Sequence, residues 1–185
     1  MIPHHTSDRW QQVDVAFWSV TLGGLLLDQI TKRVIVAWLA LGERFAIIPG
    51  FFDLCHVQNT AAAFGMGSDM EHRMWLYAAV TLLFVVGILA FQRWSSRDDV
   101  QLHRIAGLLF SGVLGNAIDR AEKGSVTDFL LVYVGDGSLR DTLISTVGTS
   151  YWPAFNVADS ALCVGVVLLA AHMLGNEAGD DLQLD

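Results

Sequence analysis

Aspartates interrupt the apolar segments of this 185-residue chain, and their chemistry makes them the first candidate site residues. They are Asp28 within the first apolar segment, Asp119 and Asp128 after the third, and Asp159 near the start of the fourth. An ionised carboxylate in hydrocarbon costs roughly 3 kcal/mol or more, so such groups usually face a protein interior or a wet cavity. The role of each aspartate therefore depends on whether it has a partner nearby.

Asp28 has a partner on its own helical face. Lys32 follows it by four residues, with the acid N-terminal to the base, which is the favourable order for a helical ion pair. The simplest interpretation is a structural ion pair that lets the helix tolerate two charges.

A second polar pattern occurs twice. Asn116, Asp119 and Arg120 lie on one helical face, and Asn156 precedes Asp159 by the same spacing. In a helix bundle such faces pair with one another because lipid offers no polar partner. We expect Arg120 to neutralise Asp119 locally.

Asp128 and Asp159 lack such partners, since no basic residue lies within four positions of Asp128. If Pro153 is the first residue of the last helix, Asp159 lies ~9 Å along that helix, near the membrane surface. Two close carboxylates share a proton, so one can act as a general base on water while the other protonates a leaving amine. This chemistry needs no metal and no cofactor.

Most of the chain that carries these residues has the composition of membrane helices. The chain is 53% hydrophobic and only 16% charged, and its apolar residues are concentrated in long segments. We predict a single polytopic domain over residues 1–185: a mainly α membrane protein with four transmembrane helices and a small β cradle. The helices are predicted at about 15–41, 73–92, 103–120 and 154–175, with β and loop regions at about 42–72 and 121–153 outside the bilayer.

The outer regions carry turn and strand signals. Pro49 and Gly50 separate two β-prone runs, Phe45–Ile48 and Phe51–Val57, which predicts a hairpin. The stretch Gly135–Ser150 is rich in Gly, Ser and Thr, which predicts an extended loop.

Other functions receive less support. The chain has no basic stripe, which argues against nucleic acid as a partner, and its His and Cys residues show no metal-site spacing. Intramembrane carboxylates also serve as proton relays in transporters, although these place charges near mid-span within inverted repeats. A structural assembly subunit with polar helix contacts is a third possibility. The distribution of Lys and Arg does not decide the orientation in the membrane.

Five short motifs indicate a family. DQITK (28–32), NTAAAFG (59–65), GNAIDR (115–120), VTDF (126–129) and PAFNVADSA (153–161) occur in the order seen in lipoprotein signal peptidases, which this chain resembles. The resemblance implies an aspartyl endopeptidase of the bacterial inner membrane, inhibited by globomycin-type peptides. It would remove signal peptides from prolipoproteins, cutting before the diacylglyceryl-modified cysteine, with cytoplasmic termini and an extracytoplasmic active site. We expect it to act in contact with membrane lipid as a monomer.

The resemblance also assigns roles to residues. The catalytic aspartates fall on Asp128 and Asp159. The supporting positions fall on Asp28, Lys32, Asn59, Asn116, Asp119, Arg120 and Asn156. Two departures stand out: Ala61 replaces the family's usual glycine, and the stretch between the catalytic aspartates is longer than usual, which predicts an enlarged outer loop in Gly135–Ser150.

Overall fold

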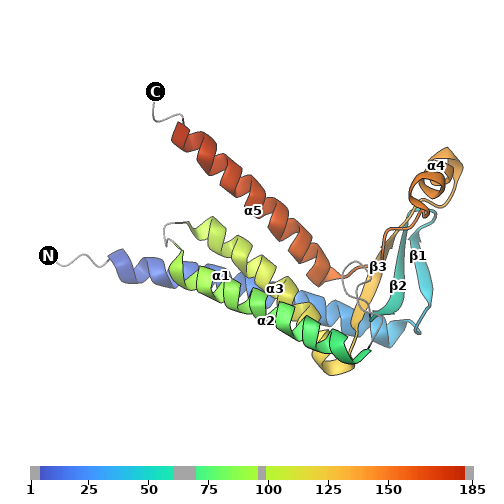
Figure 1. Ribbon diagram of the computed structural model, residues 1–185, viewed down its shortest axis with the longest axis horizontal. Helices are drawn as coiled ribbons and strands as arrows, with labels where there is room; N and C mark the ends of the chain where they lie inside the picture. Colours follow the sequence, from blue (N-terminus) through green and yellow to red (C-terminus); the bar gives the residue numbers. More distant parts are fainter. Residues whose placement is uncertain (1–4, 61–69, 96–98, 182–185) are drawn as a thin grey trace.

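The computed structural model describes residues 5–60, 70–95 and 99–181, with side chains over 11–60, 75–95 and 99–175. Its elements, in chain order, are α1 (His5–Trp38), β1 (Arg44–Ile48), β2 (Phe52–Asn59), α2 (Met70–Trp94), α3 (Val100–Lys123), β3 (Val126–Val132), α4 (Gly137–Val147) and α5 (Val157–Asp181) (Figure 1). Ala61, the departure in the second motif, lies outside the described residues.

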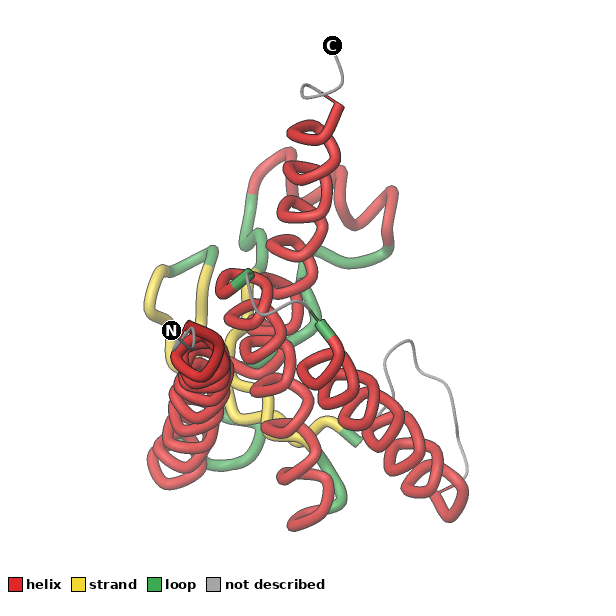
Figure 2. The backbone as a smooth tube through the Cα atoms, turned by 90° about the vertical axis from the view of Figure 1, so that its left-hand side faces the viewer, coloured by secondary structure: helices red, strands yellow, loops and turns green. Residues whose placement is uncertain are grey.

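Helix α3 lies at the centre of the bundle. It packs against α1, α2 and α5, as the view along the bundle shows (Figure 2). At the end far from the sheet, Phe17 of α1 packs with Ala106 and Phe110 of α3 in a buried apolar cluster. Because α3 is enclosed by other helices, its polar side chains can meet protein groups rather than lipid.

Within the part of the chain that the structure describes, three helices are long and apolar enough to cross a membrane: Gln11–Trp38, Trp75–Trp94 and Val157–Gly175. The chain is therefore a multi-pass membrane protein. In α2, Trp75 and Trp94 are 76% and 83% exposed at the two ends of a 20-residue apolar segment. That segment is about 30 Å long, the thickness of a bilayer core, and tryptophans favour its two interfaces. Helix α3, predicted as a fourth span, is long enough but is not among these apolar candidates.

A small antiparallel sheet closes one end of the bundle. Its strand order among the described residues is β1-β2-β3, and the predicted hairpin forms around Gly50, whose φ of 80° favours glycine. Phe129 of β3 is buried against Ile35 and Leu39 at the end of α1. The sheet is thereby fixed where α1 ends and α5 begins (Figure 1).

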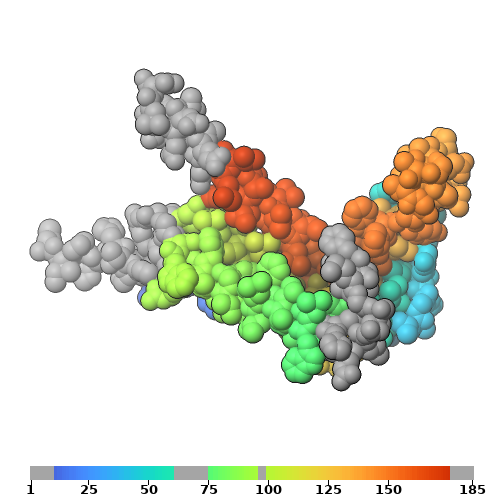
Figure 3. Space-filling view, in the orientation of Figure 1, coloured from blue at the N-terminus to red at the C-terminus, as the bar shows by residue number. Residues whose placement is uncertain are grey.

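The prediction of a loop over Gly135–Ser150 is wrong, because α4 occupies most of it. Ser and Thr disfavour helices when their hydroxyls compete for backbone groups. Here Thr142 and Thr146 donate to carbonyls four residues earlier, at 2.8 and 2.7 Å, and Gly148 ends the helix with a φ of 81°. In the space-filling view, α4 (orange) stands apart from α5 (red), with an open notch between them (Figure 3).

The prediction that Pro153 begins the last helix is also wrong. Residues 151–155 instead run beside β3, with bridges Tyr133↔Tyr151 and Leu130↔Phe155, and α5 begins only at Val157. Asp159 therefore lies in the first turn of α5 and not ~9 Å along it.

Close packing of α1, α3 and α5 makes Gly115 sensitive to substitution. A Cβ there would lie 2.5 Å from Asp28 Oδ2 and 3.0 Å from the Cβ of Ala158. We expect Gly115→Ala to lower the free energy of unfolding by about 1–3 kcal/mol, measured by thermal unfolding in detergent. Gly87→Ala on α2 is the matched control, since nothing lies within 4 Å of its added Cβ. Equal stability of the two variants would contradict this packing.

Candidate active site

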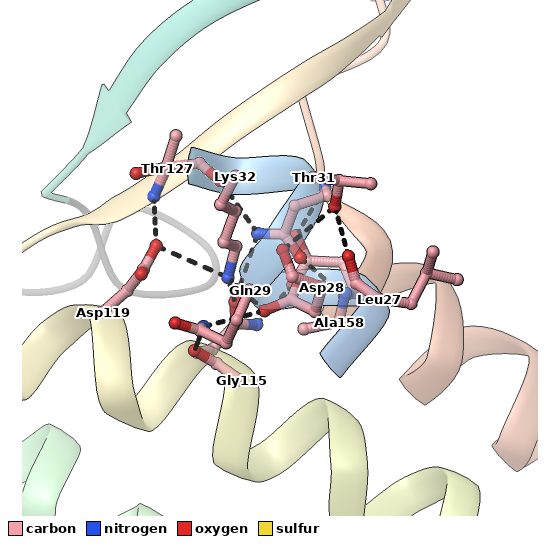
Figure 4. A network of polar contacts seen from close by, with 12 residues as sticks. Leu27, Asp28, Gln29, Thr31, Lys32, Gly115, Asp119, Thr127 and Ala158 are labelled. Atoms are coloured by element: carbon pink, nitrogen blue, oxygen red, sulfur yellow. Dashed lines mark hydrogen bonds and ion pairs between the residues drawn. The ribbon is translucent and has the colours of Figure 1, made fainter. Parts of the chain in front are cut away.

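A buried lysine lies at the centre of the polar residues. The Lys32 Nζ atom lies 2.9 Å from Asp28 Oδ2 and 3.4 Å from Asp119 Oδ2, and all three side chains are at most 1% exposed. Figure 4 shows Lys32 between the two carboxylates, at the point where α1, α3 and β3 meet. The same ammonium donates to Asn116 Oδ1 at 3.2 Å. A buried cation with three oxygen partners has each of its three N–H groups directed.

Asp28 connects this lysine to the start of α5. Its Oδ1 accepts the backbone N–H of Ala158 at 2.9 Å, while its Oδ2 accepts from Gln29 Nε2 at 3.1 Å. The first N–H groups of a helix have no partner within the helix, and a carboxylate there is further stabilised by the helix dipole. Asp28 therefore fixes the position of α5 against α1.

Asp119 connects the lysine to the start of β3. Its Oδ2 accepts the backbone N–H of Thr127 at 2.9 Å, and its Oδ1 accepts from Lys123 at 3.2 Å. The expectation that Arg120 neutralises Asp119 is wrong, because consecutive residues of a helix point in different directions. The cations that pair with Asp119 are Lys32 of α1 and Lys123, one turn further along α3. The hydrogen bond from the Thr127 N–H fixes the backbone there and thereby the position of the next residue, Asp128.

Two asparagine amides join Asp128 to Asp159. Asn156 Nδ2 donates to Asp128 Oδ1 at 2.8 Å and to Asn116 Oδ1 at 3.1 Å. Asn116 Nδ2 donates to Asp159 Oδ1 at 2.7 Å. Asn116 Oδ1 also accepts from Lys32. Because an ammonium can only donate, this contact fixes which way the Asn116 amide points, and the Asn116 contact in turn fixes the Asn156 amide.

The N-x-x-D spacing at the start of α5 forms a capping box. Asn156 Oδ1 accepts the N–H of Asp159 at 2.9 Å, and Asp159 Oδ2 accepts the N–H of Asn156 at 3.2 Å. Such reciprocal bonds satisfy two otherwise unpaired backbone donors and hold both side chains in one rotamer. The same spacing at Asn116 and Asp119 lies within α3, where the side chains face neighbouring elements instead.

Asp128 is the more deeply buried of the two carboxyls, at 2% exposure. Its Oδ2 accepts from Asn59 Nδ2 at 2.9 Å, at the end of β2. Burial and, secondarily, the charge of Asp159 raise the pKa of Asp128 to about 6, against the hydrogen bonds from Asn59 and Asn156, which lower it. Asp159 is half-buried. The pair thus combines a carboxyl that keeps its proton up to about pH 6 with a more accessible one.

The structure brings eight of the nine predicted site residues into one hydrogen-bonded network, with Asn59 at its β2 edge. Arg120 lies beside it: its only hydrogen bond among the described residues is a long one, 3.4 Å to the Asn116 carbonyl oxygen. Our sequence reasoning missed Gln29, Lys123 and Thr127. Lys123 had a signal, because it follows Asp119 by four residues on the same helix. No group of three or more His, Cys, Asp or Glu side chains in the described ranges could hold a metal.

These features define a class: a multi-pass membrane protein with two aspartates held together by amides where the bundle meets its sheet. A sequence model described as signal peptidase (SPase) II matches residues 20–175. The chain belongs to this signal peptidase II family, a family of aspartic peptidases.

Individual relatives agree with the family assignment. A lipoprotein signal peptidase of Geobacter sulfurreducens is 41% identical over 162 residues, covering 87% of this chain and 92% of that protein. One from Bacillus velezensis is 32% identical over 85% of this chain and 93% of its own length. A solved structure described as a bacterial membrane enzyme has a TM-score of 0.70 and 27% identity, covering 86% of this chain and 88% of that one.

The central role of Lys32 can be tested by removing its charge. Lys32→Met leaves Asp28 and Asp119 buried without their shared counter-charge, and we expect a loss of about 3–5 kcal/mol in the free energy of unfolding. The neighbouring Arg33 is exposed, so Arg33→Met is a matched control that should change stability by about 0.5 kcal/mol or less. Chemical denaturation in detergent measures both. A Lys32→Met variant as stable as Arg33→Met would show that the buried charges do not depend on Lys32.

Proposed function

We propose that this chain is an aspartyl endopeptidase that removes signal peptides from diacylglyceryl-modified prolipoproteins, with Asp128 and Asp159 as its catalytic pair. One observation carries the residue assignment: the two carboxyls are bridged by the Asn116 and Asn156 amides, next to a buried charge network. Family membership supports the peptidase over the transporter and the assembly subunit considered above.

The pair suits peptide hydrolysis. Asp159, half-buried at the start of α5, takes a proton from a water molecule, whose oxygen attacks the scissile carbonyl carbon. Asp128, which keeps its proton up to about pH 6, donates a hydrogen bond to the carbonyl oxygen as negative charge develops there. Collapse of the tetrahedral intermediate breaks the C–N bond, and a carboxyl of the pair supplies the proton that the leaving amine needs.

The remaining residues would act as supports. Asn59, Asn116 and Asn156 direct the carboxyl oxygens, and Asp28, Lys32 and Asp119 hold the helix end and strand that carry them. Arg120 has N–H donors available, which suits it to contact substrate.

We further propose how the protein sits in the bacterial inner membrane. Helix α3 would be the fourth span, because the helices around it exclude lipid from its polar groups. The sheet and the carboxyl pair would face the extracytoplasmic side, where an exported precursor presents its cleavage site. The substrate would enter from the lipid and would be cleaved just before its modified cysteine. A single copy of the enzyme would suffice, because the hydrogen-bonded network is complete within one chain.

Catalysis by the pair predicts a large effect of isosteric substitution. Asp128→Asn and Asp159→Asn should each lower the rate of prolipoprotein cleavage by about a thousand-fold or more, because general acid–base catalysis is lost. Cleavage of a lipid-modified precursor by the purified protein, followed on gels, measures this. Asp53→Asn is the control: Asp53 is a buried aspartate of β2 that accepts from Tyr133 Oη at 3.0 Å, and its variant should retain cleavage within about tenfold. Wild-type rates in either pair variant would reject the assignment.

The pKa of Asp128 predicts the pH dependence. With a value of about 6, kcat/KM should decline above about pH 6 as the proton of Asp128 is lost. The Asn59 N–H stabilises the ionised carboxylate, so Asn59→Ala should raise this pKa and move the alkaline limb to higher pH. Gln58→Ala, at the exposed neighbouring position, should leave the limb in place. A limb that moves to lower pH in Asn59→Ala would contradict the role of this hydrogen bond.

A further inference from the structure

We propose that Tyr77 of α2 is a positioning residue for cleavage, which holds the Arg120 guanidinium with its ring and the end of β2 with its hydroxyl. Tyr77 belongs to none of the five family motifs. The inference rests on the proposed function, because that function gives Arg120 and Asn59 their roles at the site.

The ring of Tyr77 is the principal constraint on Arg120. The guanidinium carbon lies 4.8 Å from the ring centroid, within the range of a cation–π contact. Among the described residues no carboxylate pairs with Arg120, and its hydrogen bond to the Asn116 carbonyl oxygen is long at 3.4 Å. The ring therefore holds the guanidinium while most of its five N–H groups remain available to a substrate carbonyl.

The surroundings of Arg120 make this constraint necessary. Tyr77 and Arg120 line a cavity of about 350 Å³ between α2 and α3, whose walls include the small side chains Ala78, Ala117 and Ala121. These small residues leave the arginine side chain room to adopt other rotamers. Without the tyrosine ring, the guanidinium would lose its preferred position near the Asn116 carbonyl oxygen.

The hydroxyl of Tyr77 acts on a second group. It donates to the backbone carbonyl oxygen of Thr60 at 3.2 Å. Thr60 follows Asn59, whose side chain donates to Asp128 at 2.9 Å. Tyr77 thus ties the end of β2 to α2, and loss of this tie would loosen the hydrogen bond on the catalytic carboxyl.

The two contacts predict separable kinetic effects. Tyr77→Phe removes only the hydroxyl, so kcat should fall about two- to tenfold with little change in KM, and the alkaline limb should move to higher pH as it does in Asn59→Ala. Tyr77→Leu also removes the ring, so KM should rise in addition by about two- to thirtyfold. Phe84→Leu is the control, an aromatic residue exposed on the same helix, and should change neither parameter more than about twofold.

A double-mutant cycle distinguishes positioning from general stability. Arg120→Lys keeps the charge but loses the planar stacking group, so Tyr77→Leu should raise KM little further in that background. Steady-state kinetics on lipid-modified prolipoprotein, with thermal midpoints of every variant, provide the data. Unchanged kcat and KM in both Tyr77 variants would overturn the inference, as would an undiminished KM effect of Tyr77→Leu in the Arg120→Lys background. Failure of the wild-type protein to cleave the precursor would instead reject the proposed function itself.

Discussion

A single buried ammonium determines how this protein arranges its acids. Lys32 lies against Asp28 and Asp119, and all three side chains have almost no solvent exposure. Water therefore cannot solvate either the ammonium or the two carboxylates. Buried ions are tolerated only when their partners are close and their remaining donors and acceptors are satisfied. The two carboxylates meet this condition by accepting backbone N–H groups from α5 and β3, which ties both elements to α1 and α3.

The proposed catalytic pair follows from that arrangement. Asp159 belongs to the turn of α5 that Asp28 fixes, and Asp128 follows the residue of β3 that Asp119 fixes. In a strand, neighbouring side chains point to opposite sides, so Phe129 packs on α1 while Asp128 faces Asn59 and Asn156. The amides of Asn116 and Asn156 then join the two carboxyls without adding a charge. Burial of Asp128 and, secondarily, the charge of Asp159 raise the pKa of the Asp128 carboxyl to about 6.

The spacing of residues in the sequence predicts those contacts that form between residues close together in the chain. The Asp28–Lys32 pair and the hairpin at Gly50 follow from patterns within a few residues, and three of the four predicted spans follow from long apolar segments of the described chain. The pairing of Asp119 with Lys32 could not be predicted in this way, because Lys32 is 87 positions away along the chain. The adjacent Arg120 points elsewhere. The prediction placed the start of α5 too early, because proline is compatible both with the first turn of a helix and with an extended segment beside a strand. The capping box of Asn156 and Asp159 was the more specific signal.

The proposed catalysis depends on electrostatic coupling between the carboxyls of Asp128 and Asp159. The most direct test is a carbon-13 NMR titration of the aspartate carboxyls in detergent, comparing the wild-type protein with Asp159→Asn. We expect the Asp128 carboxyl of the wild type to titrate near pH 6, and removal of the Asp159 charge to lower the pKa of Asp128. An Asp128 titration that is the same in both proteins would contradict the coupling on which the proposed chemistry depends.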